Sequence, residues 1–204
     1  HSPRKQRWFM MRVTPFELSG SRYFVIAHQD VTERKRAEEE VSHLARLDGL
    51  TNIPNRRAFD EFISKEWRRC ARLQKPMSLA ILDLDHFKLL NDTYGHQKGD
   101  ECLRQMASVL KKVSNRPSDL CARYGGEEFA IVWGDTPLEK AQGLADKLLR
   151  DLIELKIPHS RSPVSQYLTA SVGLAQSLPA RTNCVDEIIS KADAMLYEAK
   201  EAGR

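Results

Sequence analysis

Two adjacent glycines followed at once by two glutamates, at residues 125–128, constrain the fold of this chain more than any other feature. Leu120 and Cys121 lie before them, and the apolar, aromatic run of residues 129–133 lies after them. Because glycine alone accepts positive φ without strain, this arrangement predicts a tight β-hairpin with Glu127 at the mouth of its turn. Taken by itself, the motif also fits a surface hairpin with solvated acids.

Length and composition are those of a globular protein. The 204 residues suffice for one full core and a smaller appendage, and 41% hydrophobic with 29% charged residues is ordinary. The net charge of +4 is mild, and the basic residues are spread along the chain. We therefore expect no nucleic-acid partner, although scattered basic residues suit phosphates.

The sequence also bears on location and redox state. No apolar run approaches the roughly 20 residues that span a bilayer, and no signal peptide is recognisable, so a cytoplasmic location is expected. The chain starts at His1 rather than Met, so we expect a fragment of a longer protein, which could be tethered to a membrane through its missing N-terminal part. Four widely separated cysteines predict buried free thiols rather than disulfides or a metal site: Cys70, Cys102, Cys121 and Cys184.

Two segments precede the main domain. In residues 1–32, two runs rich in aromatic and β-branched residues flank Ser19-Gly20-Ser21, which predicts a hairpin. An isolated hairpin is marginal in water, so this one should belong to a larger sheet. Residues 33–47 are densely charged and carry apolar residues at helical spacing, which predicts a linker helix that pairs with a copy of itself. A rigid spacer that pairs with nothing is the alternative.

Residues 48–204 form the main domain. Strand and helix signals follow the order β-α-β-β-α-β with flanking helices, which predicts an α+β fold with a split βαβ, ferredoxin-like central sheet. The strand near residues 78–85 is apolar on both faces until its acidic end, as expected at the centre of a covered sheet. A helix is predicted from about Asp100 to Val113, and residues 136–139 have the form of a capping box. The last helix is predicted from about Val185 to Ala202.

Carboxylates from two different elements converge in this topology. Asp83 ends the first strand of the domain, which lies beside the hairpin, so Asp83 can face Glu127 across the sheet. Mg²⁺ favours one or two protein carboxylates, with water and substrate phosphate in the remaining positions. Without a cation the two acids would repel each other and one would be protonated. Two solvated acids at a sheet edge remain the alternative.

Four separated motifs resemble the diguanylate cyclase (GGDEF) family in its Glu-Glu variant. They lie within residues 48–57, 83–100, 123–129 and 192–204, so the match covers the whole main domain. The resemblance implies a fold like that of nucleotide cyclases and polymerase palm domains. It also implies an enzyme dependent on Mg²⁺ (or Mn²⁺) that condenses two GTP molecules, one per subunit of a homodimer, into cyclic di-GMP with release of two pyrophosphates.

The resemblance assigns roles to individual residues. Asp83, Glu127 and the carbonyl of Leu84 would hold the metal ion, and Glu127 and Glu128 would be catalytic. Glu128 would orient the 3′-hydroxyl or bind metal, and a structural ion pair with Arg123 is its alternative role. The remaining substrate contacts would be Phe87, Lys88, Asn91, His96, Asp100, Gly125, Gly126, Lys200 and Arg204.

Physical chemistry supports several of these roles. Asn91 and Asp100 would read guanine, because an aspartate accepts the N1–H and N2–H₂ donors that adenine lacks. Asp100 could also cap a helix. Lysine and arginine side chains such as Lys88 suit phosphates, and the helix that starts near Phe87 would direct its free amides toward them.

Arg116 and Asp119 have the spacing of the family's inhibitory product site, Arg-x-x-Asp, just upstream of the glycines. An arginine can bond guanine O6 and N7 bidentately. The resemblance therefore implies inhibition by bound cyclic di-GMP.

Other positions depart from the family or lie outside it. Asn52 stands where the family usually has glycine, and asparagine tolerates the left-handed conformation, so the turn should survive. His159 has no recognisable partner and is interpreted as an ordinary polar residue. Residues 1–32, which end in Asp30-Val31-Thr32, resemble the closing hairpin of a PAS sensor domain, and a signalling helix follows.

Two other functions were weighed. A non-catalytic receptor for GTP or cyclic di-GMP would usually lose a metal carboxylate or a base reader, and this chain retains Asp83, Glu127, Asn91 and Asp100. A cyclase that makes a mixed dinucleotide should carry a smaller residue in place of Asp100.

Overall fold

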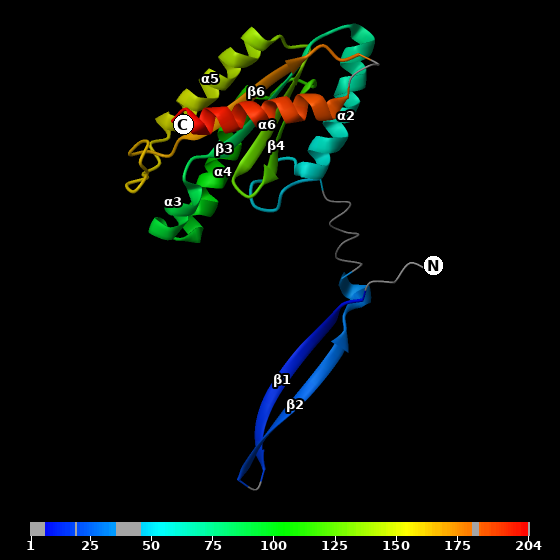
Figure 1. Cartoon of the computed structure of the whole chain (residues 1–204), viewed down its shortest axis with the longest axis vertical. Helices are drawn as coiled ribbons and strands as arrows, with labels where there is room; N and C mark the ends of the chain where they lie inside the picture. The colour runs from blue at the N-terminus through cyan, green and yellow to red at the C-terminus, as the bar shows by residue number, and fades with distance from the viewer. Residues whose placement is uncertain (1–6, 19, 36–45, 181–183, 204) are drawn as a thin grey trace. The chain divides into compact units, whose positions relative to one another are not determined.

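The computed structural model describes residues 7–18, 20–35, 46–180 and 184–203 (Figure 1). The chain divides into two compact units, residues 1–45 and 46–204. Each unit has its own β-sheet, and each is described by itself.

The first unit is a hairpin. Strands β1 (Phe9–Leu18) and β2 (Ser21–Asp30) pair antiparallel, and Gly20 takes φ +75° in the turn, which confirms the predicted hairpin. Residues 32–35 are helical, at the start of the predicted linker helix, whose residues 36–45 lie outside the described part of the chain. Leu47 is not helical but forms a β-bridge with Pro54, so the predicted end of that helix at residue 47 is wrong.

The second unit has a four-stranded antiparallel sheet in the order β4-β5-β3-β6 (Figure 1). The first strand of the unit is thus central, beside the hairpin of the next two strands. This order confirms the α+β, split βαβ prediction. The elements are α2 (Arg56–Leu73), β3 (Met77–Leu84), α3 (Phe87–Tyr94), α4 (His96–Val113), β4 (Asp119–Gly125), β5 (Glu128–Gly134), α5 (Leu138–Glu154), β6 (Ala170–Ser177) and α6 (Val185–Glu201).

Helices cover both faces of this sheet. Side chains of the central strand β3 point alternately to the two faces, so successive residues pack against different helices. Leu79 and Ile81 pack in one apolar cluster with residues of α2 and α6. Ala80 and Leu82 pack in the other with residues of α3, α4 and α5. Both clusters are buried and apolar. The polar residues therefore lie at the ends of the strands, where they can form the site.

Some of the predicted helix caps, turns and buried cysteines are present in the structure and others are not. Asn55 caps α2 by accepting a hydrogen bond from the Ala58 amide, and Asn52 takes φ +52°, as predicted. The capping box is wrong: α5 begins at Leu138, whose amide donates to Gln176 Oε1 at 2.6 Å. Cys184 is exposed, whereas the other three cysteines are buried free thiols as predicted.

The helix predicted to start near Phe87 is present as α3, whereas the helix predicted from Asp100 begins earlier. Helix α3 occupies Phe87–Tyr94, and Gly95, with φ +85°, separates it from α4, which starts at His96. Asp100 is therefore the fifth residue of α4, and its predicted alternative role as a helix cap is wrong.

Candidate active site

Three acidic residues lie where β3 ends and β5 begins. Asp83 lies directly opposite Glu128 in the β3–β5 register, and the Leu84 amide donates to the Glu127 carbonyl at 3.4 Å. The cross-strand partner of Asp83 is therefore Glu128, one residue away from the predicted Glu127, which lies in the turn. Like charges directly opposite in a sheet are destabilising. This edge of the sheet therefore favours a cation.

Lys200 of α6 supplies one positive charge to this edge. Its Nζ lies 2.9 Å from Asp83 Oδ2, and the side chains of Lys200 and Asp83 are only 27% and 16% exposed. Within the described ranges, Glu127 and Glu128 have no ion pair. The three carboxylates are thus only partly neutralised. Arg204, the other C-terminal residue expected at this site, lies outside the described residues.

The two glycines provide space for neighbouring groups and do not adopt unusual backbone angles. Neither glycine takes a positive φ, so the prediction that the turn uses glycine for this conformation is wrong. A Cβ on Gly125 would lie 2.9 Å from Glu128 Oε2, so the Glu128 carboxylate lies against a bare Cα. A Cβ on Gly126 would meet no atom within 4 Å, which leaves open space above the turn. Gly126 and Glu127 form the centre of this turn, because Gly125 pairs with Glu128.

Arg123 holds the turn in place. Its Nε and Nη2 donate to the Gly126 carbonyl at 2.9 and 2.8 Å, and its Nη1 donates to Asp48 Oδ1 at 3.1 Å. Burial alone would raise the pKa of Asp48, but hydrogen bonds from Thr51 and Arg123 outweigh it and lower that pKa. The Arg123 guanidinium is therefore engaged with Asp48 and the turn, and the alternative ion pair with Glu128 is not formed.

The two predicted base readers lie on neighbouring helices. Asn91 of α3 has a buried side-chain oxygen with no hydrogen-bond partner, as expected of a group that awaits a ligand. A Cβ on Gly99 would lie 1.9 Å from this oxygen and 3.2 Å from the Phe87 ring, so glycine is required for Asn91 to lie there. Asp100, next to Gly99, is half-buried. The Asn91 side chain thus lies against Gly99, the residue that precedes Asp100.

The predicted contacts on the flanks of the site are open to solvent. Lys88, in the first turn of α3, and His96, at the start of α4, are both exposed. An exposed lysine beside free helix amides remains available to an anion.

Sequence reasoning missed His159. Its side chain is 1% exposed, and its Nε2 lies 3.2 Å from the His86 carbonyl, at the residue that precedes α3. A lone histidine in a polar loop gives no sequence signal of such a contact.

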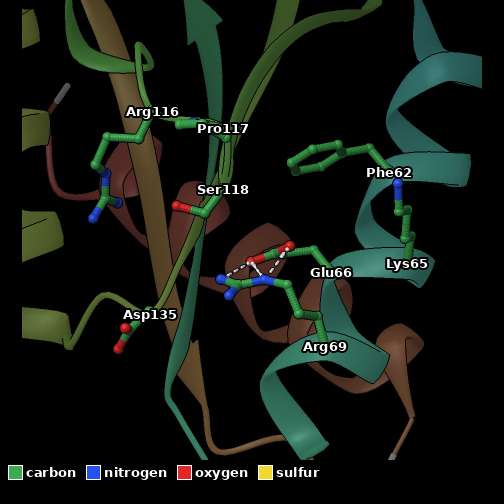
Figure 2. A pocket seen from close by; sticks show the side chains of 8 residues that line it. All are labelled: Phe62, Lys65, Glu66, Arg69, Arg116, Pro117, Ser118 and Asp135. Atoms are coloured by element: carbon green, nitrogen blue, oxygen red, sulfur yellow. Dashed lines mark hydrogen bonds and ion pairs between the residues drawn. The ribbon is translucent and has the colours of Figure 1, made fainter. Parts of the chain in front are cut away.

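A second polar site lies at the other end of β4 (Figure 2). Arg116 donates through Nε to Asp119 Oδ2 at 2.9 Å and through Nη2 to Asp119 Oδ1 at 2.7 Å, so the predicted pair is assembled. A pocket of about 410 Å³ opens beside it, between this turn and α2. It is lined by Phe62, Lys65, Glu66, Arg69, Arg116, Pro117, Ser118 and Asp135.

Arg69 is a second arginine of this pocket that the sequence did not reveal. Figure 2 shows its guanidinium bonded to Glu66, with Nη2 2.6 Å from Glu66 Oε1. Hydrogen bonds to Asp119 raise the pKa of Arg116, and those to Glu66 raise the pKa of Arg69. Both arginines are thus charged and held by carboxylates of the same chain.

The donor set at the sheet edge fits a hard cation that is completed by a substrate. No three His, Cys, Asp or Glu side chains of the described residues form a group that could hold a metal ion alone. Two carboxylates, Asp83 and Glu127, and the nearby Leu84 carbonyl are oxygen donors of the kind that Mg²⁺ accepts alongside phosphate and water.

No described helix is long and apolar enough to cross a membrane.

Comparison with known proteins gives consistent matches. Diguanylate cyclase DgcM of Escherichia coli K12 is 35% identical over 93% of this chain and 44% of DgcM. Cyclic di-GMP phosphodiesterase PdeR of the same strain is 33% identical over 98% of this chain and 30% of PdeR. The coiled coil and GGDEF domain of Caulobacter crescentus DgcB, in complex with c-di-GMP, is 33% identical with a TM-score of 0.70, over 84% of this chain and 91% of that one.

These relatives define the family. The chain spans less than half the length of DgcM and about a third of PdeR. Diguanylate cyclases are nucleotidyltransferases that need a divalent metal ion, and the oxygen donors described above suit one. Residues 45–204 match the diguanylate cyclase GGDEF domain, and this chain therefore belongs to the GGDEF family.

Proposed function

We propose that this chain is the catalytic part of a longer signalling protein and converts two GTP molecules into cyclic di-GMP and two pyrophosphates. One observation carries the proposal: Asp83 lies opposite Glu128 at one sheet edge, Glu127 lies in the adjoining turn, and Lys200 on Asp83 is the only cation paired with them in the described part of the chain. Such an edge is suited to a divalent cation with a triphosphate.

Each residue of the edge has a task in the proposed reaction. Asp83, Glu127 and the Leu84 carbonyl would hold Mg²⁺, which offsets the negative charge that develops on the reacting phosphate. In each of two such steps, the 3′-oxygen of one GTP forms a bond to the α-phosphorus of the other, the bond to pyrophosphate breaks, and the hydroxyl proton passes to water. Glu128, opposite Asp83, orients the attacking hydroxyl by accepting its hydrogen bond.

The rest of the site would recognise GTP. Lys200, Lys88 and the first amides of α3 contact the phosphates, and Arg204 would join them. Asn91 and Asp100 bind the guanine edge, which accounts for the unpartnered Asn91 oxygen. The open space over Gly126 leaves room for the nucleotide, and the exposed His96 would be a further contact.

Each site would hold one GTP, so two subunits must meet. The charged linker that begins with the helical residues 32–35 would pair two chains as a homodimer and control how their sites meet. Residues 1–32 would be the end of a PAS-like sensor, because the exposed apolar residues Met11, Val13, Phe24 and Ile26 need a covering layer. The catalytic domain itself would comprise residues 48–204.

Cyclic di-GMP would inhibit the enzyme from the pocket of Arg116 and Arg69. Both guanidinium groups line that pocket, and each can bond a guanine Hoogsteen edge. Asp119 and Glu66 hold them in place in the absence of ligand.

A non-catalytic receptor is the second candidate. The match to PdeR, whose name is that of a phosphodiesterase, favours it, since a GGDEF-type domain can accompany another activity. Retention of the three carboxylates favours catalysis.

One assay separates the candidates. The purified chain is incubated with GTP and Mg²⁺, with and without ATP, and products are identified by chromatography. The cyclase proposal predicts cyclic di-GMP alone in both reactions. No product, with GTP still bound, would support the receptor, and a mixed dinucleotide would overturn the assignment of Asp100.

A further inference from the structure

The loop before β6 reaches across to helix α3. The His159 side chain in this loop is 1% exposed, and its Nε2 lies 3.2 Å from the carbonyl oxygen of His86. A carbonyl can only accept, so Nε2 carries the proton and donates. His159 Nδ1 is buried without a partner, so a second ring proton would be unsatisfied there.

The same loop also holds the other end of α3. Tyr94, the last residue of α3, donates through its hydroxyl to Ser160 Oγ at 2.7 Å and accepts from the Ser160 amide at 3.0 Å. Adjacent loop residues, His159 and Ser160, thus contact the residue before α3 and the residue that ends it.

The loop is itself anchored to the fold. The His159 amide donates to the Gln166 carbonyl at 2.8 Å, and Pro158 forms a β-bridge with Tyr167. Ile157, which precedes them, is 4% exposed. The loop therefore provides a fixed support.

The bond from His159 acts on a strained position. His86 takes φ +54°, a left-handed conformation that is uncommon for a residue with a side chain. Its carbonyl also accepts from the Leu90 amide at 3.1 Å. The peptide that joins His86 to Phe87 is planar, so fixing its carbonyl oxygen fixes its N–H in the opposite direction. That N–H is the first free amide of α3.

We propose that His159 is a positioning residue for the triphosphate of GTP. By donating to the His86 carbonyl, it fixes the direction of the Phe87 amide and the start of α3, which carries Lys88. This inference rests on the proposed function, because it takes the α3 amides as phosphate contacts. Tyr94 and Ser160 secure the far end of the helix in the same way.

Binding measurements with two variants test the proposal. His159→Phe removes the donor while filling the buried space, and His159→Gln keeps an N–H donor. The control Ser78→Ala removes a buried hydroxyl that donates to the Thr136 carbonyl at 2.8 Å, far from α3. The probes are 3′-deoxy-GTP with Mg²⁺, which lacks the attacking hydroxyl, and GMP, which lacks two phosphates.

Loss of one hydrogen bond should weaken 3′-deoxy-GTP binding by roughly tenfold in His159→Phe. GMP binding should change much less, and His159→Gln and Ser78→Ala should keep the wild-type ratio of the two affinities. An unchanged ratio in His159→Phe, or an equal loss in His159→Gln, would overturn the role of His159. If the wild-type chain bound no 3′-deoxy-GTP at all, the proposed function would fail instead.

Discussion

The two ends of strand β4 are built from similar residues but differ in charge balance. At its start, Arg116 pairs with Asp119, and the neighbouring Arg69 pairs with Glu66, so each guanidinium has a carboxylate. At its end, Lys200 pairs with Asp83, and Glu127 and Glu128 have no ion pair among the residues that the structure describes. The first end is balanced within the chain. The second is left negative and is completed only by a cation.

This difference assigns the two ends to different kinds of ligand. A balanced pair of arginines can exchange carboxylate partners for a guanine without another ion. A cluster of carboxylates repels a triphosphate unless a metal ion stands between them. We therefore expect ligand binding at the proposed substrate end to depend on a metal ion, and binding at the proposed product end not to.

Breaking the carboxylate cluster should have the largest effect. Glu127→Gln removes a charge from the proposed metal site and should lower cyclic di-GMP synthesis by about 100- to 1000-fold, as for loss of one electrostatic contact to a transition state. Initial rates at saturating GTP and Mg²⁺ measure it. The exposed Glu139→Gln on α5 is the matched control. Activity within a fewfold of wild type would remove Glu127 from the site.

Loosening the arginine pair should affect inhibition. Arg116→Lys keeps a positive charge beside Asp119, which is 2% exposed, but loses the planar fork. We expect the concentration of cyclic di-GMP that halves the rate to rise about tenfold, equivalent to one bidentate contact. Arg150→Lys, on the exposed side of α5, should leave inhibition unchanged. Equal inhibition of wild type and Arg116→Lys would contradict the product site.

A side chain that crowds Asn91 should weaken GTP binding at the substrate end. Gly99→Ala would place a Cβ 1.9 Å from the Asn91 oxygen, so the amide must move and the KM for GTP should rise about tenfold through the lost guanine bond. Gly143→Ala in α5, where a Cβ meets nothing within 4 Å, serves as control and should stabilise the helix. A KM unchanged by Gly99→Ala would mean that Asn91 does not read the base.

The smallest effect concerns the support of the turn. Asp48→Asn removes a partly buried partner of Arg123 and should lower the free energy of unfolding by about 1 kcal/mol near neutral pH. The pKa of Asp48 is lowered by folding, so its contribution is present above the ordinary value of 3.8 and lost as pH falls through the lower folded value.

Denaturant unfolding at several pH values checks this sign. The difference in free energy of unfolding between wild type and Asp48→Asn should be the same at neutral and mildly acidic pH. It should shrink below pH 3.8. Glu101→Gln, which breaks a more exposed pair with Lys98, should change stability less. A difference that grows in acid would contradict the role of Asp48.

The sequence predicted the sheet well because its signals are local. The two-sided apolar run of β3 and the hairpin beside it determine the strand order, and Asn55 and Gly20 act as expected. The start of α4 was placed at Asp100 rather than His96 because helical spacing alone does not define the first turn of a helix. The cap of α5 was missed because Gln176, a residue distant in sequence, supplies it.

The site was predicted by residue type but not by register. Gly126 and Glu127 form the turn, so Glu128 rather than Glu127 lies opposite Asp83, a shift of one position. His159 and Arg69 were missed because their importance depends on contacts with loops and helices far along the chain. Packing decides such contacts, and residue spacing does not encode it.

The most direct test of the two-ended account is the rate of cyclic di-GMP synthesis from GTP and Mg²⁺, measured with and without added cyclic di-GMP. The wild-type chain should be active and inhibited, Glu127→Gln should be inactive, and Arg116→Lys should be active with weakened inhibition. If Glu127→Gln retained the wild-type rate, or if it lost inhibition while Arg116→Lys lost synthesis, the assignment of the two ends of β4 would be contradicted.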